Sequence, residues 1–177
     1  GVDLSLNAVR QARAKGLAAL QIQDAALLPF PAEAFDAAVS VEVLEHLFQP
    51  HLAAAEVLRV LKPGGRFILT VPNVAYWRRR VELAILGRWN PFGDNLSVQQ
   101  PWRDPHIRFF NVGALRRMLL QAGFRSVVVG GDYGGFFTDL PGIRRYAGAE
   151  PSGVYTALQL RFPGLFGQRL SAVATKP

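Results

Sequence analysis

Residues 59–71 read RVLKPGGRFILTV, and this stretch decides the fold class. Its Pro63-Gly64-Gly65 turn separates a helical pattern that follows Pro50 from a run at 67–71, which is apolar at four of its five positions. A strand that is apolar throughout is typical of a parallel sheet that is covered on both faces. The stretch therefore predicts a helix that leads through a tight turn into a buried strand.

Strands and helices alternate on both sides of this stretch. The expected strands are residues 1–3, 20–23, 35–41, 67–71, 126–130 and 171–175, and the strand at 35–41 is expected to be buried. Three helices are expected. The first spans about residues 7–15 with Ser5 as its N-cap, the second follows Pro50, and the third ends at about residue 121 with Asn111 as its N-cap. Such alternation implies parallel strands joined by crossovers, so we expect an α/β fold.

Residues 72–110 interrupt the alternation. They hold the three tryptophans and a run of arginines at 78–80, and they resemble an insertion over the ends of the strands. Residues 73–80 are expected to form a lid helix within it. Residues 131–168, rich in glycine, proline and aromatic residues, connect the last two strands. The whole chain, residues 1–177, is expected to be a single domain.

Composition and charge exclude several classes of protein. No apolar run approaches the roughly 20 residues that span a bilayer, no signal segment precedes the first helix, and there are no cysteines for disulfides or metal sites. We therefore expect a soluble, cytoplasmic protein. Residues 61–177 carry sixteen basic and six acidic residues, which leaves peripheral contact with a membrane surface open. No recognition motif for nucleic acid accompanies this charge.

Two acidic residues directly follow expected strands. In open parallel sheets, ligands bind beyond the carboxyl ends of the strands. Asp3 is placed to accept hydrogen bonds from ribose hydroxyls, and Asp24 from an adenine amino group. The alternative for each is a structural cap, because aspartate after a strand is common in that role.

Several motifs, taken in order, resemble those of class I S-adenosylmethionine-dependent methyltransferases. They are GVDLS at 1–5, DA at 24–25 with LPF at 28–30, FD at 35–36, LEH at 44–46, RVLKPGG at 59–65, HIRFF at 106–110, Leu115 and AGF at 122–124. The resemblance covers nearly the whole chain, and its motifs are specific for the superfamily but not for the substrate.

The resemblance implies a fold and a cofactor site. The fold would be a Rossmann-like sheet, mostly parallel, with one antiparallel strand near the carboxyl end. S-adenosylmethionine would be the cofactor, with Asp3 on its ribose, Leu4, Asp24 and Ala25 around its adenine, and the backbone of Val41 at its methionine part. The family's first strand and its glycine-rich loop would precede Gly1, so we expect an N-terminally truncated domain that binds the cofactor weakly.

The acceptor side offers two candidate catalytic residues. His46 follows the fourth strand of the family's order and is placed to act as a general base toward a hydroxyl acceptor. His106 is placed to line the acceptor pocket from the 72–110 insertion. The structural alternatives are that His46 caps or packs a short helix and that His106 belongs to a loop pinned by salt bridges.

A metal site is a second interpretation of the same region. Glu42, Glu45 and His46 resemble the metal-binding motif of ubiquinone-biosynthesis O-methyltransferases, and two carboxylates with an imidazole suit a divalent cation. Nothing in the sequence forces the three side chains to converge, so the metal-free interpretation is favoured.

Methyl transfer to a small-molecule acceptor is the function that these features favour. A hydroxyl of a quinone-like, sugar or lipid-linked substrate is the expected target. One alternative is a nicotinamide-dependent oxidoreductase, which needs a tyrosine followed four residues later by lysine; here Tyr76 is followed by Arg80 and Tyr133 by Phe137. The other alternative is a non-catalytic Rossmann-like module. The sequence does not indicate an oligomeric state.

Overall fold

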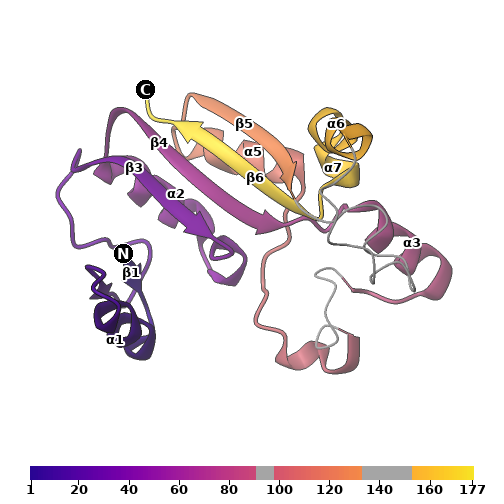
Figure 1. Ribbon diagram of the computed structural model, residues 1–177, viewed down its shortest axis with the longest axis horizontal. Coiled ribbons are helices and arrows are strands. Elements are labelled where there is room, and N and C mark those ends of the chain that lie inside the picture. The colour runs from indigo at the N-terminus through magenta and orange to yellow at the C-terminus, as the bar shows by residue number, and fades with distance from the viewer. Residues whose placement is uncertain (91–97, 133–152) are drawn as a thin grey trace.

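The computed structural model describes residues 1–90, 98–132 and 153–177, and the strands of this part form two sheets (Figure 1). Strands β1 (Val2–Asp3) and β2 (Leu20–Gln21) pair in parallel. The larger sheet has the order β3-β4-β6-β5, formed by β3 (Phe35–Val41), β4 (Leu61–Pro72), β6 (Arg169–Thr175) and β5 (Ser126–Asp132).

The larger sheet is mixed. Strand β3 runs parallel to β4, whereas β6 runs antiparallel to both of its neighbours, β4 and β5. The expected antiparallel strand near the carboxyl end is therefore present. The expectation of one continuous sheet is wrong for the described residues, because β1 and β2 pair only with each other.

The N-terminal helix and its cap are as predicted. Helix α1 spans Leu6–Ala14, and the Ser5 hydroxyl accepts a hydrogen bond from the amide of Ala8 at 3.3 Å. Gly16 follows the helix with φ +77°, a left-handed conformation that glycine adopts without steric cost.

The turn at 63–65 is incorporated into the start of β4. Phe35 is paired with Leu61 but Ala37 with Arg66, so the residues between form a bulge in β4. Gly64 has φ +76°, and a Cβ on Gly65 would lie 2.7 Å from the carbonyl oxygen of Lys62. Both glycines are therefore required by the backbone of the bulge.

The hydrophobic core lies on one face of the four-stranded sheet. Helix α2 (Pro50–Val60) and helix α5 (Val112–Gln121) cover this face and lie behind the sheet in Figure 1. The core side chains of β4 that pack there are Phe67, Leu69 and Val71. The Asn111 side chain caps α5 as predicted, accepting a hydrogen bond from the amide of Ala114 at 2.9 Å.

The opposite face of this sheet is open in the described structure. Val39, Ile68, Val173 and Val128 are paired across the four strands in one row, and their exposed fractions lie between 38% and 68%. The prediction that residues 35–41 form a buried strand is therefore right about the strand and wrong about its burial. Burial depends on which elements cover each face, and α2 and α5 cover only one.

The segment after β4 contains a helix, as expected for residues 73–80, but shifted along the chain; its role as a lid stays a prediction. Helix α3 spans Trp77–Leu86. Arg78 and Arg79 form ion pairs with Glu82 on the same helix, and Arg80 donates to the carbonyl of Ala75.

The short helices α6 (Gly153–Arg161) and α7 (Pro163–Phe166) precede β6 and were not predicted. No helix in the described ranges is both long and apolar enough to cross a membrane.

Asn73 joins the end of β4 to the segment before β6. Its side-chain amide, which is buried, donates to the carbonyls of Gly167 at 2.7 Å and Gly164 at 3.1 Å, and its side-chain oxygen accepts from the amide of Ala75. We expect Asn73→Ala to lower the free energy of unfolding by about 1–3 kcal/mol, because it leaves buried backbone groups without partners.

Urea denaturation of this variant checks the prediction, with Asn7→Ala as the matched control on the exposed surface of α1. An Asn73→Ala variant as stable as the control would show that these hydrogen bonds do not hold the two segments together.

Candidate functional site

A cavity of about 970 Å³ lies between the β1–α1–β2 unit and β3. Figure 1 shows this unit below the edge formed by β3. Most of the lining side chains are apolar, and they come from β1, β2, β3, α2 and the connecting loops. The residues predicted to bind the cofactor or to act on the acceptor that line it are Asp3, Leu4, Ala25, Val41 and His46.

Asp3 lies at the carboxyl end of β1, where it is exposed toward solvent. One carboxylate oxygen, Oδ1, accepts a hydrogen bond from the amide of Ser5 at 2.7 Å, which fixes the side chain at the start of α1. Leu4 follows it, with its carbonyl accepting from the side-chain amide of Gln21 on β2. The acid is thus held at the end of its strand, on the wall of the cavity.

Asp24 takes a different place from Asp3. It is not among the residues that line the cavity, and its Oδ1 accepts from the amide of Ala26 at 2.8 Å, as in a turn. Its neighbour Ala25 does line the cavity. The role of Asp24 at the adenine stays a prediction.

Glu42 follows β3 in an uncommon backbone conformation. Its φ is +52°, in the left-handed region that non-glycine residues rarely adopt, and its amide donates to the carbonyl of Thr70 on β4. Its Oε2 lies 3.6 Å from the Arg169 guanidinium on β6. Strained residues of this kind cluster at functional sites, and this one turns the chain from β3 into the 3-10 helix that carries Glu45 and His46.

Glu45 is the most deeply buried charged residue of the site. It has no exposed surface, and neither carboxylate oxygen has a hydrogen-bond partner among the described residues. Burial raises the pKa of this carboxyl to about 7, and the neighbouring Glu42 carboxylate adds to the rise. His46, whose Nε2 lies 3.9 Å from Oε1, and Arg169 offset this rise in pKa only in part.

His46 and His106 lie against each other. Their ring centroids are 4.5 Å apart with an interplanar angle of 30°. His46 Nδ1 is 3.2 Å from the carbonyl oxygen of Pro105, and His106 Nδ1 is 2.6 Å from Oδ1 of Asp104. His46 lines the cavity, whereas His106 stands behind it and is not among the lining residues.

Backbone hydrogen bonds hold these two segments together. The amides of Ile107 and Arg108 donate to the carbonyl of Glu45 at 2.9 and 3.0 Å, joining the 106–108 segment to the 3-10 helix at Leu44–His46. One ligand atom each from Glu45, His46 and His106 lies within 4.8 Å of the other two. Glu42, which the sequence grouped with Glu45 and His46, is not in this set and instead faces Arg169.

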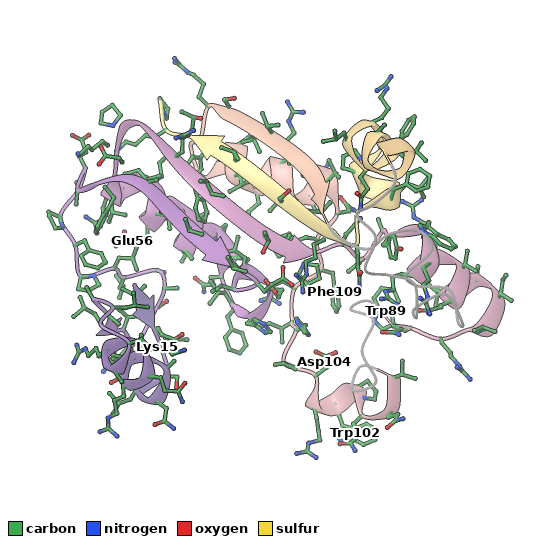
Figure 2. All side chains as sticks on the ribbon, in the orientation of Figure 1. Lys15, Glu56, Trp89, Trp102, Asp104 and Phe109 are labelled. Carbon is green, nitrogen blue, oxygen red and sulfur yellow. The ribbon has the colours of Figure 1, made fainter. Side chains whose placement is uncertain are left out.

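Two features of the site were not found from the sequence. Asp104 was not singled out, although its place two residues before His106 was the available indication. Trp89 and Phe109 pack edge to face with centroids 5.8 Å apart, and Figure 2 shows them together beside the segment that leads to Asp104 and Trp102. Both are about half exposed, and Phe109 follows His106 by three residues in the sequence.

Comparison with known proteins gives one family and several relatives. The family model described as "Methyltransferase domain" matches residues 1–69. The chain is 31% identical over 159 residues to the ubiquinone/menaquinone biosynthesis C-methyltransferase UbiE of Syntrophotalea carbinolica, covering 84% of this chain and 67% of that protein. It is also 31% identical over 127 residues to the tRNA (carboxymethyluridine(34)-5-O)-methyltransferase of Arabidopsis thaliana, covering 65% of this chain but 30% of that protein.

Solved structures agree on the fold. A SAM-dependent methyltransferase of Thermotoga maritima, described as a possible histamine N-methyltransferase, superposes with a TM-score of 0.65 at 22% identity. The match covers 100% of this chain and 72% of that structure. At this identity the similarity establishes an α/β methyltransferase-like fold and carries no information about the acceptor.

Proposed function

The chain belongs to the class I S-adenosylmethionine-dependent methyltransferases, and from this membership we propose that it methylates a small, quinone-like acceptor that carries a ring hydroxyl. The observation that carries the proposal is the single cavity that holds Asp3, Leu4, Ala25 and Val41 together with His46. A cofactor-binding edge and a proton-accepting group thus share one space.

The residues around the cavity fit the cofactor. A nucleoside with ribose hydroxyls needs an acceptor of hydrogen bonds beside apolar walls, and Asp3 supplies the acceptor next to Leu4 and Ala25. Val41 lies at the end of β3, where ligands of open α/β sheets bind. When bound, S-adenosylmethionine supplies an electrophilic methyl group on a positively charged sulfur.

An aromatic acceptor suits the apolar character of the site better than a sugar does. Around His46 the cavity is lined by the apolar side chains of Leu44, Leu47 and Ala53 and by one carboxylate, that of Glu42, so apolar surface predominates there. The relative from Syntrophotalea carbinolica acts in ubiquinone and menaquinone biosynthesis by its name, which supports the same class of acceptor.

The chain's own residues then have two tasks. The cavity walls orient the acceptor for in-line displacement, a contribution that can supply roughly 7–11 kcal/mol of barrier reduction. His46 takes the hydroxyl proton: a carbonyl only accepts hydrogen bonds, so Nδ1 of His46 carries the hydrogen toward Pro105, and Nε2 has the lone pair. The oxygen that loses this proton to Nε2 would accept the methyl group, and the cofactor would leave as S-adenosylhomocysteine.

We expect Asp3→Ala to weaken the binding of S-adenosylhomocysteine by about 10- to 150-fold, because a charge-assisted hydrogen bond is worth about 1.5–3 kcal/mol. Isothermal titration calorimetry measures the change. Asp36→Ala is the matched control, since Asp36 is an exposed acid of β3 that pairs with Lys62 outside the cavity. Equal affinity in the two variants would remove Asp3 from the cofactor site.

A further inference from the structure

Two segments that are distant in sequence bring three metal-ligating side chains together. Glu45 and His46 belong to the 3-10 helix after β3, and His106 lies near the C-terminal end of the 72–110 insertion. Their juxtaposition rests on main-chain hydrogen bonds, those of the Ile107 and Arg108 amides to the Glu45 carbonyl. The geometry is therefore fixed by the fold and not by flexible side chains alone.

Both imidazoles are oriented by an acceptor on the same ring nitrogen. Nδ1 of His106 lies 2.6 Å from the Asp104 carboxylate, and Nδ1 of His46 lies 3.2 Å from the Pro105 carbonyl. Because each acceptor takes a hydrogen from Nδ1, the lone pair of each ring is on Nε2. Histidines that bind metals are held in this way, with one nitrogen donating to a carboxylate or a backbone carbonyl and the other binding the ion.

The buried Glu45 carboxylate lacks hydrogen-bond partners among the described residues. It is fully buried, and neither oxygen accepts a hydrogen bond from the described residues. A buried carboxylate without a partner is costly, whether it is ionised or loses its charge. His46 Nε2 is 3.9 Å from Glu45 Oε1, a separation that leaves room for an ion between them.

We propose that Glu45, His46 and His106 bind one divalent transition-metal ion of the zinc class. Two imidazoles and one carboxylate are the ligand set of catalytic zinc sites that keep a further position open. Ligand atoms of a tetrahedral zinc site are about 3.3 Å apart, as follows from zinc–nitrogen and zinc–oxygen distances of about 2.0–2.1 Å. The present atoms lie within 4.8 Å of one another, so small side-chain rotations bring them into range.

The proposed ion would occupy a particular place relative to the cavity. His46 is both a proposed ligand and a cavity residue, so the open position of the ion faces the acceptor side. There it would lower the pKa of a bound acceptor hydroxyl. Because Nε2 of His46 cannot both bind the ion and accept a proton, a bound ion would replace the base role proposed for His46. The inference concerns metal binding and stands independently of which acceptor is methylated.

Titration of the chelator-treated 177-residue chain with Zn²⁺ against a competing indicator tests the proposal. We expect one equivalent to bind, and Glu45→Gln and His106→Ala each to weaken binding at least 100-fold. Asp104→Ala should weaken it about 10- to 100-fold, the usual effect of removing a group that orients a ligand. The matched control is His51→Ala, because His51 is exposed on α2 and is the third histidine of the chain.

Circular dichroism of each variant separates loss of the metal site from loss of the fold. Glu45→Gln and His106→Ala change proposed ligands that belong to different segments of the chain. Co²⁺ provides a second readout through its visible absorption, which should be intense in the parent chain and absent from the folded variants. Failure of the parent chain to bind Zn²⁺ would overturn the proposal. Parent-like affinity in folded Glu45→Gln and His106→Ala would overturn it as well.

Discussion

His46→Ala is expected to slow methyl transfer by about 10²- to 10⁴-fold while leaving cofactor affinity nearly unchanged, because a positioned acid–base group contributes a factor of this size. His46 lines the same cavity as the proposed cofactor residues Asp3 and Leu4, but it belongs to the 3-10 helix after β3, whereas they lie at the end of β1. Transfer of labelled methyl from S-adenosylmethionine to menadiol, a small hydroquinone, measures the rate. Calorimetry with S-adenosylhomocysteine measures the affinity.

The control for this prediction is His51→Ala, which removes an exposed imidazole of α2 that is not a cavity residue. We expect it to retain the parent rate. If His46→Ala also retains the parent rate, His46 is not the base, and this region contributes only by orienting the acceptor.

Phe67→Ala is expected to lower the free energy of unfolding by about 3–5 kcal/mol, the typical cost of emptying a buried aromatic site. Phe67 is 1% exposed, lies in β4 and stacks on Phe124, with the two ring centroids 5.8 Å apart. The cost is large because α2 and α5 both pack on this face, so the space cannot collapse without moving a helix.

Chemical denaturation compares this variant with Phe48→Ala, which truncates a phenylalanine that is 80% exposed. The control should change stability by less than about 0.5 kcal/mol, as surface substitutions usually do. Similar midpoints for the two variants would show that the sheet face bearing Phe67 is not the core.

Local patterns predicted most of the strands and helices correctly. The capping side chains of Ser5 and Asn111, and the apolar run at 67–71, act over a few residues, and the structure confirms each of them. Burial of β3 could not be predicted in the same way. The periodicity of residues 35–41 describes the strand, but whether Val39 is covered depends on distant elements, and none of the described ones covers it.

The site shows the same division between local and long-range information. Asp3 was proposed from its place at the end of a strand, where ligands of parallel sheets bind, whereas Val41 was proposed only from the family resemblance; both residues line the cavity. The convergence of His106 with Glu45 and His46 was not predicted. It depends on two backbone hydrogen bonds to the Glu45 carbonyl, which join segments about 60 residues apart and leave no trace in the spacing of either motif.

Nuclear magnetic resonance of the isotope-labelled 177-residue chain during titration with S-adenosylhomocysteine tests the central claim most directly, because it detects even weak binding and locates it. We predict that the amide signals of Asp3, Leu4, Ala25 and Val41 shift together with one saturation curve, since these residues line the same cavity. Signals of α5, which contributes no residue to the cavity, should stay in place. Absence of shifts at these four residues, or shifts confined to other elements, would contradict the assignment of the cavity as the cofactor site.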